Sequence, residues 1–332
     1  YYQGKVFTVW GASKHVNPDL RWEKGVNWNV GLDFSLFDNR ISGSVNYYNR
    51  TQKDLLGDYN VSIPPYLFST TFVNVGTMKN SGVEVELHGR IFDKKDFSYD
   101  VSLVGSTMDN RFISFSNSDY KGQKYYYVAP TEDPFPFHYL QRIQEGERVG
   151  NFYMWKYAGL NSDGEWVIYD KNGEYKAGMD ATDEDMYVVG NGLPKFTASW
   201  SNYLKYKNLD LSIYFRGAFG FEIFNIHEFY YGIPGMTSNV MKTAYTKNAN
   251  IKENPLVCDY FIERGDYLKL DMVTIGYTIP LVSKYFDSVR FSLTGKNLFT
   301  LTSFSGVDPS TYSTNGLTPG ATGSRNYYPT CR

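Results

Sequence analysis

Apolar and polar side chains alternate strictly along residues 26–36, which is the pattern of a β-strand with two different faces. The apolar positions are Val26, Trp28, Val30, Leu32, Phe34 and Leu36. Residues 37–40, Phe-Asp-Asn-Arg, interrupt the pattern, and it resumes from Ile41 to Tyr48. The two runs therefore predict a β-hairpin with one apolar and one polar face.

The same alternation predicts three further hairpins. They pair residues 83–91 with 97–105, 196–206 with 209–219, and 273–279 with 289–296. The turns inside the hairpins are short, whereas the connections between hairpins, residues 51–80, 108–194, 220–266 and 300–332, are much longer. Bacterial outer-membrane barrels have short periplasmic turns and long extracellular loops. The chain is therefore predicted to be all-β, with eight strands of a transmembrane antiparallel β-barrel. Residues 152–160 are predicted to be a strand inside an extracellular loop.

Composition removes two rival classes of protein. The chain is 18% aromatic, yet it contains no continuous apolar run of about 18 residues, as a membrane-spanning helix would require. The most apolar stretch, residues 209–226, still carries Asp210, Arg216 and Glu222. The formal net charge of −2 shows no excess of basic residues that could bind nucleic acid. A helical membrane protein and a nucleic-acid-binding protein are both excluded.

The sequence offers no pattern typical of catalysis. Neither a nucleophile elbow nor a phosphate-binding glycine loop occurs, so the chain is predicted not to be an enzyme. Cys258 and Cys331 have no metal-ligand spacing around them, and whether they form a disulfide stays open. Acidic groups in residues 161–164, 170–174 and 180–185 could gather a calcium ion, although ordinary Asx-Gly turns explain them as well. No metal or other cofactor is predicted, with loop-bound calcium as the alternative.

Several long motifs, in order, resemble the SusC/RagA class of TonB-dependent outer-membrane transporters of Bacteroidota. The first is LRWEKGVNWNVGLDFSLFDNRISGSVNYYNRTQKDLL from Leu20, and the second is NVGTMKNSGVEVEL from Asn74. The others are VGNFYMWKYAGL from Val149, PKFTASWSNYLKYKNLDLSIYFRGAFG from Pro194, FIERGDYLKLDMVTIGYTIP from Phe261 and VRFSLTGKNLFTLTSFSGVDPS from Val289. The resemblance covers nearly the whole chain.

That resemblance implies a plugged barrel of 22 strands in the outer membrane of a Gram-negative bacterium. Residues 1–332 then correspond to the C-terminal portion of one barrel domain, about eight strands long. The plug domain and the N-terminal barrel strands are expected to be absent from this chain. The expected contact with TonB-ExbB-ExbD lies in that missing region, and the strands themselves are expected to contact outer-membrane lipid.

The leading functional hypothesis is a nutrient importer that takes up oligosaccharides together with a SusD-like surface lipoprotein. Oligopeptide import of the RagAB type is the closest alternative. A third possibility is a SusC-like barrel that acts as a structural scaffold in an outer-membrane assembly. An outer-membrane enzyme would need a clustered carboxylate, serine or histidine site, and the sequence contains no such cluster.

Two groups of residues are candidates for contact with a solute. Aromatic side chains in the loops could stack on sugar rings or peptides, or else pack the loops, contact the lipoprotein or form the aromatic girdle. These are Tyr125, Tyr126, Tyr127, Trp155, Tyr157, Trp166, Tyr169, Phe229, Tyr230 and Tyr231. The second group is expected to face the wet lumen and comprises Glu84, Glu86, His88 and Arg90.

Overall fold

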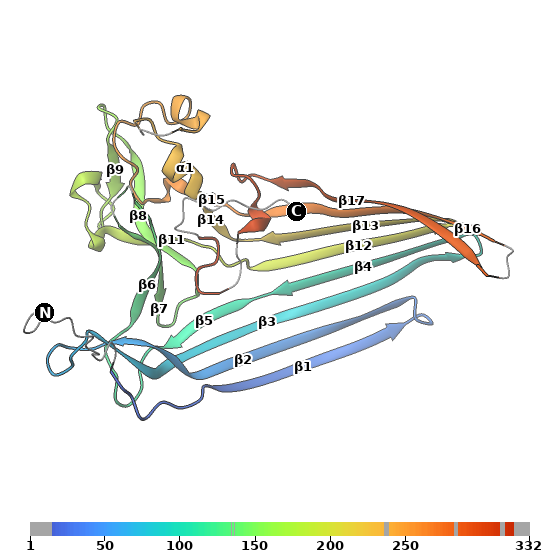
Figure 1. Ribbon diagram of the computed structural model, residues 1–332, viewed down its shortest axis with the longest axis horizontal. Helices are drawn as coiled ribbons and strands as arrows, with labels where there is room; N and C mark the ends of the chain where they lie inside the picture. The colour runs from blue at the N-terminus through green and yellow to red at the C-terminus, as the bar shows by residue number, and fades with distance from the viewer. Residues whose placement is uncertain are drawn as a thin grey trace, which may run out of the picture.

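One large antiparallel sheet forms the body of the molecule (Figure 1). The computed structural model describes residues 15–133, 135, 137–235, 239–281, 285–312 and 316–321. The hydrogen-bonded order of the long strands follows the sequence, β1-β2-β3-β4-β12-β13-β16-β17. These strands are β1 (Lys24–Leu36), β2 (Ile41–Asn60), β3 (Thr70–Lys94), β4 (Phe97–Thr107), β12 (Phe196–Tyr206), β13 (Leu209–Phe219), β16 (Tyr267–Pro280) and β17 (Ser288–Thr302). The four predicted hairpins and their eight strands are confirmed.

The strand register keeps the two faces of the sheet chemically distinct. Leu32 lies opposite Val45, which in turn lies opposite Val85, whereas Asn46 lies opposite Glu84 on the other face. The apolar face is bare, and Leu293, for example, is 77% exposed. An apolar face of this extent is unfavourable in water and is the surface that a membrane barrel presents to lipid.

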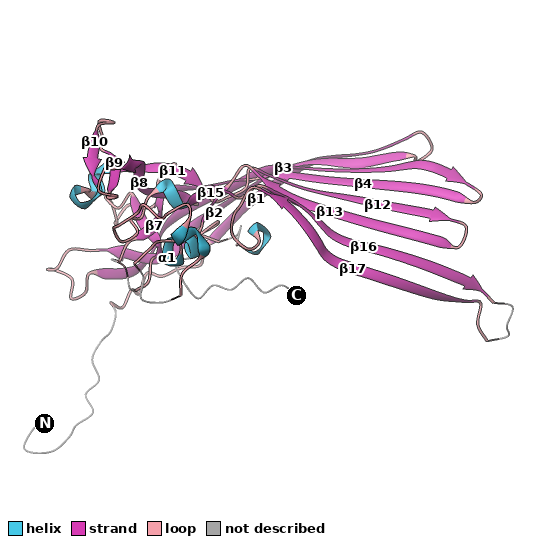
Figure 2. Ribbon diagram, turned by 90° about the horizontal axis from the view of Figure 1, so that it is seen from above, coloured by secondary structure: helices cyan, strands magenta, loops and turns pink. Residues whose placement is uncertain are grey.

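The hairpin turns gather at one end of the sheet and the long connections at the other (Figure 2). We call these ends the turn side and the loop side. One predicted loop, residues 51–80, is wrong, because β2 and β3 remain paired as far as Asn60 and Thr70. Alternation fades there because both faces are covered. Val73 and its neighbour Asn74 are both buried, so the polarity of a side chain no longer indicates which face of the sheet it lies on.

The loop side carries an assembly of shorter elements, which we call the loop assembly. β5 (Asp109–Ser114) pairs with β3, and a second sheet has the order β10-β9-β8-β7-β6 with β11 on β8. Its strands are β6 (Tyr125–Pro130), β7 (Tyr139–Gln144), β8 (Asn151–Leu160), β9 (Trp166–Tyr169), β10 (Tyr175–Ala177) and β11 (Met186–Asn191). The strand predicted over residues 152–160 is therefore β8, and it lies in the loop assembly rather than in the large sheet.

The rest of the loop assembly consists of short segments. β14 (Glu222–Phe224) pairs with β15 (Ile262–Arg264), and α1 spans Ile226–Tyr231. Single 3₁₀ turns lie at Gly178–Asp180, Asp183–Asp185, Lys242–Tyr245, Asp259–Phe261 and Pro309–Thr311. Within the described ranges, no helix is long and apolar enough to cross a membrane.

The main hydrophobic core lies in the loop assembly and not between the long strands. Phe152 and Met154 of β8 pack there with Phe229 of α1 and with Phe261. The large sheet has one face bare and one polar face, so it builds no comparable core of its own. The loop assembly is therefore a packed unit mounted on one end of the sheet.

Candidate functional site

The four residues expected to line a lumen all lie on the polar face of β3. Glu84 lies opposite Ser106 and is exposed, as is Glu86. The Nδ1 atom of His88 is 3.0 Å from the Ser102 hydroxyl oxygen, and Arg90 Nε donates to Asp100 Oδ1 at 3.1 Å. Cross-strand contacts therefore hold the side chains of His88 and Arg90, whereas solute contact by the two exposed glutamates stays a prediction.

A second charged group lies on the same face closer to the loop side. Arg216 Nε is 3.1 Å from Asp271 Oδ2. Lys269 is almost fully buried, and its Nζ atom donates to Asp308 Oδ2 at 2.8 Å and to the Ser310 hydroxyl at 3.0 Å. Sequence analysis missed this group because Asp308 lies 39 residues from Lys269 in the sequence and meets it only when the chain after β17 folds back.

Two hollows of about 470 Å³ each lie on the polar face, and these charged groups line them. His88, Arg90 and Asp100 line one of them, and Arg216, Lys269 and Asp308 line the other. Tyr214 and Met272 line both, so the hollows adjoin. The polar face thus offers a continuous surface of mixed charge and hydroxyl groups.

Three of the predicted loop aromatics are buried in the core of the loop assembly. Trp155 Nε1 donates to the Thr182 carbonyl, and Trp166 Nε1 donates to the Asn254 carbonyl, each at 2.8 Å. Tyr230 is 1% exposed, and its ring is stacked against Phe135 with 5.6 Å between centroids. These rings pack the loops, and in this structure they present no face to a solute. The same holds for Phe229, which is fully buried.

Other predicted aromatics are partly buried against one another. Tyr157 packs edge-to-face against Tyr260 with ring centroids 5.0 Å apart. The ring of Tyr169 lies 5.5 Å from that of Tyr175 and from the ammonium group of Lys156. Tyr231 packs at the edge of the core. Their solute contacts stay predictions.

Four aromatic rings, two of them exposed and two half-buried, form a ladder on the β6–β7 hairpin. Tyr127 lies between Tyr125 and Tyr139, at centroid distances of 5.5 and 5.7 Å, and Phe137 follows at 4.9 Å from Tyr139. The Arg142 guanidinium lies 5.3 Å from the Tyr125 centroid and 3.4 Å from that of Tyr153. We call Tyr125, Tyr127, Tyr139 and Phe137 the aromatic ladder. Sequence analysis named its first two members and missed Tyr139, which begins β7, and Phe137, which precedes that strand.

Tyr126 points away from the aromatic ladder and lines a separate hollow of about 450 Å³. Tyr59, Asp58 and Gln123 line the same hollow together with apolar residues. Burial raises the pKa of Tyr126 to about 12, so the ring is a neutral hydrogen-bond donor at neutral pH. The hollow combines apolar walls with a few polar groups, which is the usual make-up of a small-molecule site.

The acidic loop segments use their oxygens within the protein. Asn161 Oδ1 accepts from the backbone N–H groups of Asp163 and Glu165, each at 2.9 Å. Asp170 Oδ1 likewise accepts from Asn172 and Glu174. Asp185 receives a hydrogen bond from Lys176 at 2.7 Å, and that bond holds its pKa at about 2. Among the described residues, no three His, Cys, Asp or Glu side chains come together as a metal site would require.

Comparison with known proteins identifies the family of this chain. A family model described as "TonB dependent receptor-like, beta-barrel" matches residues 1–298. The chain belongs to the TonB-dependent receptor β-barrel family. The resemblance to this class of barrels is confirmed, and the family implies an outer-membrane location for the sheet described above.

Relatives of known name support the same assignment. The TonB-dependent receptor P3 of Formosa agariphila is 29% identical over 322 residues, which is 88% of this chain and 31% of the relative. The receptor SusC of Bacteroides thetaiotaomicron is 25% identical over 332 residues, 93% of this chain and 32% of SusC. The chain thus spans about a third of the length of these TonB-dependent receptors.

Solved structures show the same fold. A structure titled as the RagAB peptide transporter aligns with a TM-score of 0.75 and 24% identity, over 94% of this chain and 35% of that one. A second RagAB structure, titled as the open-open state of a peptide importer, gives a TM-score of 0.74 at 24% identity, over 92% of this chain and 34% of that one. Barrels of this kind present an apolar face to lipid, and the lumen-facing position of Glu84 and Glu86 stays a prediction.

Proposed function

We propose that this chain is part of an outer-membrane importer of the SusC type that takes up oligosaccharides with a SusD-like surface lipoprotein. TonB-ExbB-ExbD would supply the energy through regions of the receptor outside this chain. The proposal rests first on the aromatic ladder, which gathers four rings at the loop side and exposes those of Tyr125 and Phe137. Sugar rings have apolar faces that stack on aromatic side chains and hydroxyl edges that hydrogen-bond to polar groups.

The loop side is the end at which a large solute would enter. Tyr125 is 47% exposed, and Arg142 beside it offers hydrogen-bond donors next to the stacking surface. Glu84 and Glu86 on the polar face of β3 would then meet a solute that has passed the loops. We infer a path from the aromatic ladder along the polar face, with the hollows lined by Tyr214 as intermediate contact points.

Oligopeptide import is the second candidate, and one observation favours it. The polar face carries both signs of charge, as in the Arg216–Asp271 and Arg90–Asp100 pairs. Peptides present charged termini and side chains to such a wall, whereas neutral glycans do not. The name of the RagAB structures describes peptide transport for those proteins, and at 24% identity the likeness supports the fold only. A barrel that serves only as a scaffold would bind neither solute.

The full-length receptor, purified from its outer membrane with co-purifying chains, allows a direct test. Native mass spectrometry should detect a SusD-like lipoprotein together with retained oligosaccharide. Replacement of Tyr125 and Tyr127 by alanine should weaken oligosaccharide binding about tenfold or more, since each lost aromatic stacking contact costs on the order of 1 kcal/mol. Tyr245→Ala, an exposed ring outside the ladder, is the matched control. Retained peptide would select the second candidate, and no solute with unrelated assembly proteins would select the scaffold.

A further inference from the structure

Five cations form a row on the outward, apolar-face side of the sheet, just beyond the apolar band at its loop side. Their order follows neighbouring strands, and the row consists of Lys24, Lys53, Lys79, Arg111 and Arg148. We call this row the basic collar. The register assigns its face, because Lys79 lies four residues from Val83 with β2 and β3 paired continuously between them. An even number of strand residues keeps both side chains on one face, so Lys79 points outward as Val83 does.

Cations lie directly opposite one another within the basic collar. Lys24 is paired with Lys53 across β1 and β2, and Lys79 is paired with Arg111 across β3 and β5. Like charges in directly opposed strand positions are destabilising. The sheet therefore keeps an unfavourable charge arrangement at this height, which an anion between the side chains would relieve.

The basic collar contains few acidic partners. Asp109 is shared by two arginines, with Oδ2 at 2.6 Å from Arg111 Nε and Oδ1 at 3.1 Å from Arg148 Nε. Lys24 Nζ lies 3.5 Å from Asp54 Oδ2. In the part of the chain that the structure describes, Lys53 and Lys79 form no ion pair. The collar thus carries a positive excess although the whole chain has a net charge of −2.

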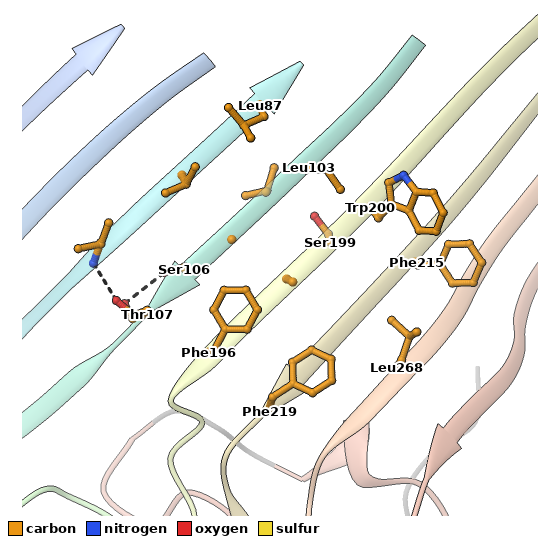
Figure 3. A pocket seen from close by; sticks show the side chains of 15 residues that line it. Leu87, Leu103, Ser106, Thr107, Phe196, Ser199, Trp200, Phe215, Phe219 and Leu268 are labelled. Atoms are coloured by element: carbon orange, nitrogen blue, oxygen red, sulfur yellow. Dashed lines mark hydrogen bonds between the residues drawn. The ribbon is translucent and has the colours of Figure 1, made fainter. Parts of the chain in front are cut away.

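An apolar groove of about 400 Å³ lies on the same face, on the turn side of the collar (Figure 3). Its floor is low because the small residues Gly105 and Ala198 lie side by side on the neighbouring strands β4 and β12. One wall is the row Leu103–Trp200–Phe215, and the other is the row Thr107–Phe196–Phe219. The groove spans β3, β4, β12, β13 and β16, all interior strands of the sheet, so further barrel strands at its edges leave it unchanged.

The distance between collar and groove suits a single amphiphilic molecule. Four strand residues separate Lys79 from Val83, which lines the groove, and this corresponds to roughly 13 Å along the strand. A soluble anion would use the collar but not the groove, and a neutral hydrocarbon would use only the groove. A molecule with a phosphate-bearing head and an acyl tail fits both surfaces.

We propose that the basic collar and the groove together bind one phosphorylated lipid of the membrane leaflet next to the loop side. Its phosphate groups lie among Lys53, Lys79 and Arg111, and one acyl chain lies over Gly105 and Ala198 between the two aromatic walls. Basic residues near a membrane surface attract anionic lipid headgroups with about 1 kcal/mol each. This lipid site is independent of the solute that the receptor carries.

The test uses the full-length receptor in detergent micelles with lipid A, a phosphorylated glycolipid, as the probe. Native mass spectrometry compares the affinity for lipid A with that for enzymatically dephosphorylated lipid A. We expect the phosphorylated form to bind at least about tenfold more tightly and the difference to shrink as salt is added. Equal affinity for the two lipids would overturn the proposal. Complete displacement of lipid A by millimolar inorganic phosphate would also overturn it, because the groove would then contribute nothing.

Two variants test the two halves of the site separately. The triple replacement Lys53→Gln, Lys79→Gln, Arg111→Gln should abolish the preference for the phosphorylated lipid. The matched control, Lys94→Gln, Lys95→Gln, Lys207→Gln, removes three cations from the turn side and should keep it. Ala198→Leu fills the groove floor and should lower the affinity for both lipids several-fold. An unaltered preference in the collar variant would reject the phosphate contacts, and undiminished binding in Ala198→Leu would reject the acyl-chain contact.

Discussion

Asp210 and Arg290 form a two-point ion pair that passes over the strand between them. Arg290 donates from Nη2 to Asp210 Oδ2 at 2.5 Å and from Nε to Oδ1 at 3.1 Å. Asp210 belongs to β13 and Arg290 to β17, while the intervening β16 has Gly276 at this height. A β-carbon on Gly276 would lie 2.3 Å from Arg290 Nη2, so only glycine leaves room for the pair.

The variant Gly276→Leu should therefore separate Asp210 from Arg290. We expect the free energy of unfolding to fall, since the charged hydrogen bonds between Asp210 and Arg290 are lost. Heat-dependent gel mobility of the full-length receptor would measure this as a lower unfolding temperature. Gly57→Leu is the control, because an added β-carbon there meets nothing within 4 Å. An unchanged unfolding temperature for Gly276→Leu would disprove the role of the glycine.

Two adjacent residues of β16 test which face meets lipid. Ile275 lies on the apolar face between Leu211 and Leu293, whereas Thr274 lies on the polar face and shares a hydrogen bond with Thr294. Ile275→Arg should cost about 2 to 4 kcal/mol if the site is near the bilayer centre, and Thr274→Arg should cost about 1 kcal/mol. Urea unfolding of the receptor in lipid vesicles measures both. Equal costs would contradict the assignment of the faces.

His138 should make the loop assembly less stable in mild acid. Its ring packs edge-to-face on Trp155 at 4.9 Å, and burial lowers its pKa below the ordinary 6.5, against a weaker opposing effect of Asp183. The unfolded loop then binds a proton more readily than the folded loop. The stability is complete above about pH 6.5 and is lost as the pH falls through the folded pKa.

Tryptophan fluorescence in a urea titration at pH 7.5 and at pH 5.5 would reveal this effect. The transition of the loop assembly should move to lower urea concentration at the acidic pH. His138→Gln should remove most of that shift, whereas His88→Gln, on the polar face of the sheet, should preserve it. A shift that persists fully in His138→Gln would assign the acid sensitivity to another group.

Asp185 should protect the loop assembly against strong acid. Its pKa of about 2 results first from the hydrogen bond with Lys176 and then from the backbone N–H of Thr182. Because the folded pKa is depressed below the ordinary 3.8, this stabilisation is present above about pH 4 and is lost as the pH falls to about 2. Asp185→Asn at neutral pH should expose β10 and β11 to proteases. Asp180→Asn, an exposed neighbour, should leave the digestion pattern of the receptor unchanged.

Alternation predicted the eight long strands because each of them has one face toward lipid and one toward polar groups. The prediction of strand residues failed where the two faces of a strand no longer differ in polarity. Val73 and Asn74 are both buried, so β2 and β3 continue into a region where the period of two is lost. β5 was not predicted for a related reason, since its six residues give too short a pattern.

The loop residues could be predicted as aromatic but not as exposed or buried. Trp155 and Tyr125 look alike in the sequence, yet Trp155 lies in the core and Tyr125 on the surface. Their difference depends on contacts with distant segments, such as the bond from Trp155 to Thr182. The ion pair between Lys269 and Asp308 could not be predicted for the same reason, because it also joins segments that are distant in the sequence. Cys331 lies outside the described residues, while Cys258 is buried as a free thiol.

The direct pairing of β4 with β12 has a consequence for how such receptors diversify. Thr107 ends β4 opposite Phe196, where β12 begins, and β5 continues along β3 as far as Ser114, so residues 115–195 leave the barrel wall and return to the neighbouring position. The length and content of that insertion therefore do not enter the register of the wall. Recombination between Ser114 and Phe196 could exchange an entire recognition module between paralogous receptors, with strand stagger and barrel diameter unchanged.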